Sequence, residues 1–138
     1  MNPTNTFVIV ADDCPAEAGV VPAAGGGKQT VASLEYELLS QRPYAFTLED
    51  LILEVHLRRA GISPEERAAR GAQIRAELFS KPHPCMRASP LTKRYGFGAH
   101  YDEGGRLAIY PRGSPEYQRL SASRDLAVVK AMRNRRDR

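Results

Sequence analysis

The pattern of hydrophobic and polar positions changes period several times along the chain. Thr6 to Ala11 is apolar at nearly every position and rich in β-branched residues, which predicts a central strand that is buried on both faces. Residues 12–29 contain two prolines and four glycines and show no periodicity, so they are expected to form a long irregular loop. Such loops are uncommon in compact domains and often have a function.

Three later segments have the apolar spacing of amphipathic helices, and each follows a Ser or Thr. The hydroxyl of such an N-cap accepts a hydrogen bond from the first turn, which favours a helix start at that point. The predicted helices are 31–41 after Thr30, 48–60 after Thr47, and 64–79 after Ser63. Gly71 within the third helix indicates either a small loss of stability or a close contact.

The C-terminal half has the pattern of a hairpin followed by short helices. Strands are expected at 94–101 and 106–110, because the turn residues DEGG separate two runs of β-forming residues. A short helix is expected from Pro115 to about Leu120, and a last one after Ser123. The predicted class is α+β, with a small antiparallel sheet of the N-terminal strand and the hairpin packed against about four helices.

The amino-acid composition is typical of a globular protein. Its 138 residues are 42% hydrophobic and 26% charged, which predicts a single domain over 1–138. The net charge of +4 comes entirely from residues 124–138, because Lys plus Arg and Asp plus Glu balance over 1–123. A basic C-terminal tail, from about 133 to 138, can attract polyanions, although such tails also occur merely as solubility devices.

Location and redox state follow from what the sequence lacks. The longest apolar runs are far below the roughly 20 residues that cross a bilayer, and the first residues do not resemble an export signal. We therefore expect a cytoplasmic protein that does not contact a membrane, with Cys14 and Cys85 as free thiols. No cofactor is assigned, and the pattern does not specify an oligomeric state.

Several motifs together resemble a known family. They are DDCP at 12–15, HPCMR at 83–87, SPLTKRYGFGAHYDEGGRLAIY at 89–110 and VKAMR at 129–133. In this order they resemble a family of small bacterial proteins that is classified only as a domain of unknown function, and the resemblance extends over nearly the whole chain. It implies one small domain, and it implies no activity, cofactor or catalytic residue.

The clearest candidate site combines basic residues with glycines. The alternation in RYGFGAHY places Gly96, Gly98 and His100 on one face of a strand, where a flat ligand or another backbone can approach closely. A helix packed over this face, or a bulge, is the favoured structural alternative. The aromatic residues of the opposite face suit either base stacking or a core, and the core is favoured. If the glycine loop at 25–28 folds over the hairpin, one anion-binding surface is expected from Lys28, Arg87, Lys93, Arg94, Gly96, Gly98 and His100.

Cysteine and histidine suggest other chemistry. Cys85 or Cys14 as nucleophile, with His83 or His100 as base, has the ingredients of a thiol enzyme, whereas a cysteine packed among apolar neighbours is inert. The same four residues are zinc-ligand types, but their spacing is unlike that of zinc modules, and no metal is assigned. Asp12 and Asp13 follow the first strand and act either as acid, base or metal ligands, or as turn formers that bond nearby amides.

These observations lead to one functional expectation and two alternatives. The first is a non-enzymatic binding module for a phosphate-bearing or nucleic-acid ligand. The alternatives are a small cysteine-dependent enzyme that uses the Cys14, His83 and Cys85 neighbourhood, and a module that binds a protein partner through an exposed apolar patch.

Overall fold

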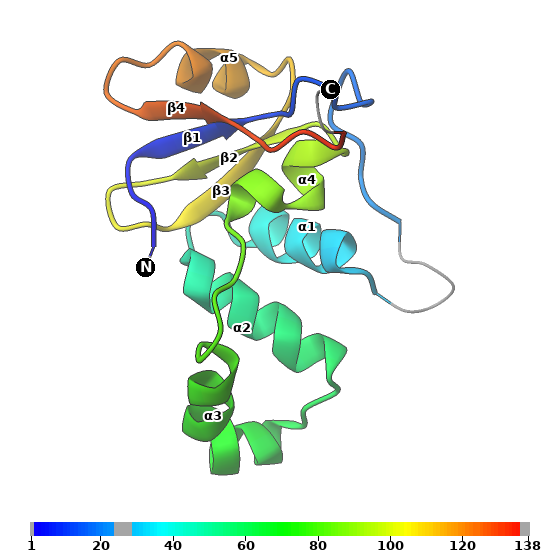
Figure 1. The fold of residues 1–138 in the computed structure, drawn as a ribbon, viewed down its shortest axis with the longest axis vertical. Coiled ribbons are helices and arrows are strands. Elements are labelled where there is room, and N and C mark those ends of the chain that lie inside the picture. Colours follow the sequence, from blue (N-terminus) through cyan, green and yellow to red (C-terminus); the bar gives the residue numbers. More distant parts are fainter. Residues whose placement is uncertain (1, 24–28, 136–138) are drawn as a thin grey trace.

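The computed structural model describes residues 2–23 and 29–135 (Figure 1). The strands are β1 (Thr6–Ile9), β2 (Phe97–Tyr101), β3 (Leu107–Pro111) and β4 (Ala127–Lys130). The helices are α1 (Val31–Gln41), α2 (Leu48–Arg59), α3 (Pro64–Leu78), the 3-10 turn η1 (Met86–Ala88), α4 (Pro90–Lys93) and α5 (Pro115–Ser121). This is the predicted α+β class. No described helix is long and apolar enough to cross a membrane.

The four strands form one mixed sheet in the order β3-β2-β1-β4. The predicted hairpin of β2 and β3 is present, and β1 pairs antiparallel with β2 so that Phe7 lies opposite His100. On its other side β1 pairs in parallel with β4. Phe7 and Val8 are both buried, so the prediction of a central strand covered on both faces is confirmed.

The last element differs from the prediction. A helix was expected after Ser123, but residues 127–130 form β4. Val128 and Val129 are β-branched, and the strand is held to β1 by bonds such as the Ala127 amide to the Asn5 carbonyl (2.9 Å). The apolar spacing of this segment also fits a helix, so only pairing with a strand far away in sequence decides its structure.

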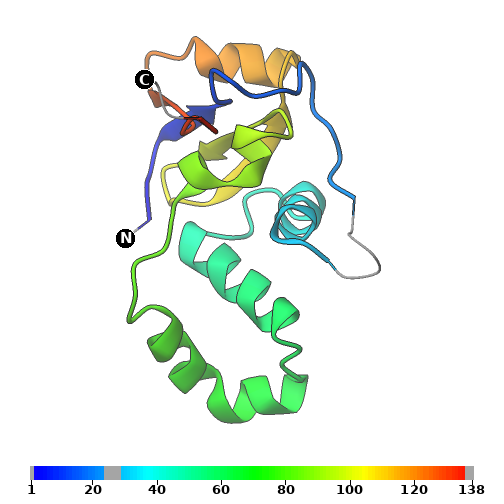
Figure 2. The ribbon, with the colours of Figure 1, turned by 45° about the vertical axis from the view of Figure 1, so that its right-hand side comes forward.

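The sheet has two differently covered faces (Figures 1 and 2). One face packs against α1, α2 and α4, and the main core lies there, with Phe97, Ala99 and Tyr101 of β2 among its members. The other face carries Phe7 and is covered by α5, whose Tyr117 ring meets the Phe7 ring edge-on. The aromatic face of β2 is therefore core, as the favoured alternative predicted.

The predicted helix starts are confirmed in detail. The hydroxyls of Thr30, Thr47 and Ser63 each accept a hydrogen bond from a backbone amide in the first turn. Figure 2 shows that helix α3 extends away from the sheet. Ile74 is the one buried residue of this helix. Gly71 of α3 has open space around it, so no close contact explains this glycine.

The segment before β2 was predicted less well. The strand begins at Phe97 rather than Arg94, because the preceding residues form η1 and α4. Ser89 is the N-cap of α4 and Pro90 its first residue, a typical start that was missed because the helix has only four residues. Gly96 adopts a φ of 78°, a left-handed conformation that ends the turn and allows β2 to begin.

Candidate functional site

The two carboxylates that follow β1 hold the C-terminal segment. The Asp13 side chain accepts hydrogen bonds from the backbone amides of Asn134 and Arg135, both at 3.0 Å, and from the Asn134 side chain at 3.1 Å. Asp12 pairs with Lys130 at 3.2 Å and with Arg133 at 3.4 Å. Asp13 bonds backbone amides, as predicted, but these amides come from the other end of the chain. Asp12 instead pairs with two basic side chains.

Asn134 connects this segment to α4. Its side-chain amide donates to the Lys93 carbonyl at 2.9 Å, and its side-chain oxygen accepts from Nε of Arg94 at 3.2 Å. Figure 1 shows the segment after β4 passing between the loop after β1 and α4. The first residues of the predicted basic tail are therefore held in a defined position.

A second link joins η1 to the end of β4. Nε of Arg87 donates to the Lys130 carbonyl at 2.8 Å, and the Met132 amide donates to the Arg87 carbonyl at 2.7 Å. Among the described residues, the terminal guanidinium nitrogens of Arg87 and Arg94 bond no protein group, and both residues are exposed. Each arginine is thus positioned through Nε while its remaining donors face solvent.

These contacts gather basic residues from two distant parts of the sequence at one place. We call this region the basic surface, made of Arg87, Lys93, Arg94, Lys130, Arg133 and Arg135 around Asp12 and Asp13. With six positive and two negative charges, this surface has a local excess of four positive charges.

The contacts with the C-terminal segment lower the pKa values of both aspartates. The hydrogen bond from Lys130 lowers the pKa of Asp12, and the charges of Lys130 and Arg133 lower it further. The pKa of Asp13 is lowered chiefly by the hydrogen bond from the Asn134 amide. Both groups remain ionised at neutral pH, so the contacts with the C-terminal segment persist there.

The other residues of the predicted anion surface lie elsewhere. Lys28 falls outside the described residues. Gly98 faces α5, where a Cβ atom would lie 2.8 Å from the Tyr117 ring, and Gly96 faces the Ala18 carbonyl. A helix and a loop therefore cover both glycines, which is the structural alternative favoured from the sequence. Arg87, Lys93 and Arg94 are brought together, but not with the glycine face.

His100 belongs to a separate hydrogen-bonded network on the α5 side of the sheet. The Tyr44 hydroxyl lies 2.8 Å from Nδ1 of His100 and 2.8 Å from the Tyr110 hydroxyl. Burial lowers the pKa of His100, so the imidazole is neutral at pH 7. Tyr44 has a φ of 59°, an unusual conformation for a bulky residue. No pattern in the sequence predicts this network.

The thiols and imidazoles are not assembled into a catalytic pair. Both cysteines are free and half-buried against the core, and no hydrogen bond joins either thiol to a histidine in the described part of the chain. The Cys14 thiol donates to the Ala16 carbonyl, and Nε2 of His83 bonds the Leu78 carbonyl at 2.6 Å. Within the described ranges, no three His, Cys, Asp or Glu side chains are grouped as metal ligands.

Exposed apolar side chains bear on the protein-partner alternative. Val20 and Val21 are exposed in the loop after β1, and Val128 and Met132 are exposed on and after β4. Two of these residues lie in each segment, and the two segments are far apart in the sequence. These residues therefore do not specify a protein partner.

Sequence reasoning missed Lys130, Arg133 and Asn134 as parts of the site. Two signals pointed to them: a pair of aspartates directly after a strand, and a local excess of basic residues near the C-terminus. Nothing in either signal showed that the two segments meet, because a parallel β1–β4 pair joins residues more than 100 positions apart.

Comparisons with known proteins place the chain in a family without assigning a function. A family model described as "Family of unknown function (DUF6157)" matches residues 1–137. No curated protein and no solved structure matches the chain. The match covers nearly every residue, including the basic surface and the sheet that supports it. The chain belongs to the family of unknown function DUF6157.

Proposed function

We propose that the protein is a cytoplasmic, non-enzymatic module that binds nucleic acid through the phosphates that meet its basic surface. The observation that carries the proposal is the local excess of four positive charges on that surface, which brings together basic residues from distant parts of the sequence. Phosphate contacts supply most of the affinity of sequence-independent nucleic-acid binding, and they require positive side chains with free donors.

Arg87 and Arg94 are the residues best suited to contact phosphates. Each is anchored through Nε to the C-terminal segment, at 2.8 Å and 3.2 Å, so little side-chain freedom remains to be lost on binding. Their outer nitrogens can form the two parallel hydrogen bonds that guanidinium groups make with phosphate. Lys130 and Arg133 are partly neutralised by Asp12 and contribute less.

The test is fluorescence anisotropy with a labelled single-stranded DNA 20-mer in 50 mM salt. The double variant Arg87→Glu/Arg94→Glu should weaken binding by at least about tenfold, since each lost phosphate contact costs about 1 kcal/mol or more. The matched control is Lys81→Glu/Arg124→Glu, which makes the same charge change at two exposed residues outside the surface. Equal losses in both double variants would show that only net charge matters and would contradict the proposed site.

A gain of affinity provides a sharper test than a loss. Asp12→Asn removes a negative charge from the centre of the basic surface and breaks the ion pairs of Asp12 with Lys130 and Arg133. It should therefore tighten DNA binding by about two- to tenfold, an effect that damage to the fold does not produce. Unchanged or weaker binding, with unchanged thermal stability, would count against the proposal.

A further inference from the structure

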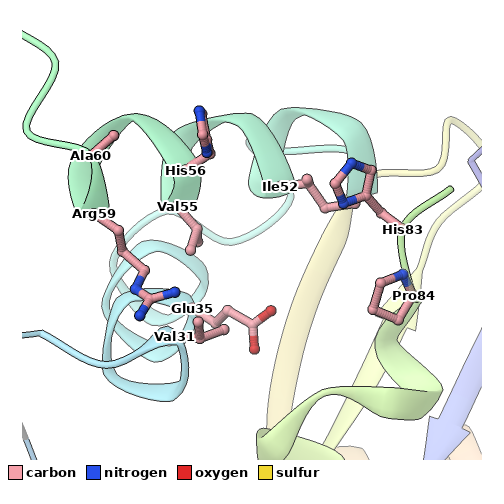
Figure 3. Close-up of a pocket in the computed structure, with 9 residues that line it drawn as sticks. All are labelled: Val31, Glu35, Ile52, Val55, His56, Arg59, Ala60, His83 and Pro84. Carbon is pink, nitrogen blue, oxygen red and sulfur yellow. The ribbon is translucent and has the colours of Figure 1, made fainter. Parts of the chain in front are cut away.

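A second candidate site lies between α1, α2 and the extended chain before η1. A cavity of about 450 Å³ opens there, within the range of small-molecule sites. Figure 3 shows that α1, α2 and the segment at His83 and Pro84 each contribute side chains to it. Apolar side chains, among them Val31, Ile52, Val55 and Pro84, form about half of its walls, and polar or charged side chains form the rest.

The cavity contains a carboxylate that is held in place but not neutralised. Oε1 of Glu35 accepts a hydrogen bond of 2.6 Å from the Ser89 hydroxyl. The Ser89 oxygen itself accepts from the Leu91 amide, so its proton must point to Glu35. In the described part of the chain Glu35 pairs with no cation, and Oε2 has no protein hydrogen-bond partner. Burial raises the pKa of this carboxyl to about 7.

A guanidinium group lies on the opposite wall. Arg59, at the end of α2, extends towards α1 in Figure 3. Within the described residues Arg59 forms neither an ion pair nor a hydrogen bond, whereas its neighbour Arg58 pairs with Glu37 and Glu54. An acid and a base that are not paired with a described residue of opposite charge therefore line one cavity, together with the apolar side chains and with His56 and His83.

We propose that this cavity binds a small zwitterionic ligand with an apolar body, an amino-acid-like molecule whose ammonium group meets Glu35 and whose acid group meets Arg59. A protonated amine supplies the donors that Oε2 lacks, and a carboxylate suits the fork of the guanidinium. The apolar walls bury the body of the ligand. This site is independent of the proposed nucleic-acid surface, and either can fail alone.

Three matched probes test the ligand class by isothermal titration calorimetry at pH 7.5. L-phenylalanine carries both charges, 2-phenylethylamine lacks the carboxylate, and 3-phenylpropanoate lacks the amine. L-phenylalanine should bind at least tenfold more tightly than either of the others. Equal binding of a singly charged probe, or no binding of L-phenylalanine at 10 mM, would overturn the proposal.

Paired variants locate the site. Glu35→Gln and Arg59→Met should each weaken L-phenylalanine binding at least tenfold, while Glu37→Gln and Arg58→Met, from the same helices but outside the cavity, should leave it unchanged. Circular dichroism verifies that each variant is folded. Equal effects in the two pairs would overturn the assignment.

Proton release gives a readout that a structural role of Glu35 does not produce. An ammonium group stabilises the ionised carboxylate, so binding at pH 6 should release a proton, whereas binding at pH 8.5 should not release one from Glu35. Titrations in buffers of different ionisation enthalpy measure the number released. In Glu35→Gln, which keeps His56 and His83, the release at pH 6 should be lost. Retention of the full release in that variant would contradict the assignment.

Discussion

The Asp13 carboxylate and Asn134, 121 residues apart in sequence, are joined through both the backbone and the side chain of the asparagine, at 3.0 Å and 3.1 Å. Asp13 lies four residues beyond the end of β1, and Asn134 lies four residues beyond the end of β4. Because these two strands are parallel, the segments that follow them leave the sheet at the same end. This relationship turns a basic C-terminal segment into part of an ordered surface.

Replacement of Asp13 should release that segment. Asp13→Asn removes the charge that accepts the amide hydrogens of Asn134 and Arg135, so those amides should exchange faster with deuterium. The control is Asp125→Asn at an exposed carboxylate that forms no hydrogen bond with a described residue. The pKa of Asp13 is lowered in the folded protein, so this contact stabilises it at neutral pH and is lost as the pH falls through the folded value. Unchanged exchange in Asp13→Asn would contradict the described contact.

Stability should depend on Glu35 in the opposite direction. Burial raises the pKa of this carboxyl to about 7, above its ordinary value of 4.5, so the folded state holds the proton more tightly. The contribution of Glu35 to the free energy of unfolding should therefore fall as pH rises from about 4.5 to about 7, by an amount on the order of 3 kcal/mol, and then level off.

The measurement is urea unfolding of the wild type and of Glu35→Gln at several pH values. The difference in unfolding free energy between them should change across this range, with the variant gaining relative stability as pH rises. Glu37→Gln serves as the control, because Glu37 lies on the same helix outside the cavity. A pH-independent difference for Glu35→Gln would show that burial does not perturb this carboxyl.

Two glycines should respond oppositely to replacement by alanine. At Gly98 a Cβ atom would clash with the rings of Phe7 and Tyr117, so Gly98→Ala should destabilise the fold by about 1–3 kcal/mol. At Gly71 there is open space within a helix, so Gly71→Ala should stabilise it by about 1 kcal/mol. Thermal unfolding of both variants measures the difference, and a neutral Gly98→Ala would argue against close packing of α5 on β2.

The Tyr44 hydroxyl should contribute measurably to stability. Tyr44→Phe leaves His100 and Tyr110 without their partner in a half-buried place, which should cost about 1–2 kcal/mol. Tyr95→Phe is the control, because the Tyr95 hydroxyl forms no hydrogen bond in the described part of the chain, and its cost should be below about 0.5 kcal/mol. Equal costs in denaturant unfolding would exclude a contribution from the network.

Most of the fold could be predicted from local patterns. The N-caps at Thr30, Thr47 and Ser63 and the turn before Arg106 rest on interactions between residues only a few positions apart, which the sequence displays directly. Strand β4 could not be predicted, because the apolar spacing around Val128 and Val129 fits either a helix or a strand. Long-range pairing with β1 decides between these two structures.

The candidate site was predicted only in part for the same reason. Arg87, Lys93 and Arg94 were expected to act together. They lie close to one another in the sequence, on η1 and at the end of α4, so their proximity is a local property. Their contacts with Lys130 and Asn134 depend on where β4 leaves the sheet. The predicted role of Gly98 required an open strand face, and the placement of α5 over that face is a tertiary property.

The dependence of DNA affinity on salt tests the central claim most directly. If the basic surface meets four to six phosphates, raising the salt from 50 to 200 mM should weaken the binding of the wild-type protein to a single-stranded 20-mer by about 50- to 300-fold. In Arg87→Glu/Arg94→Glu the dependence should be clearly shallower, because fewer phosphates are neutralised. Absent binding at 50 mM salt, or binding that salt does not change, would contradict the account.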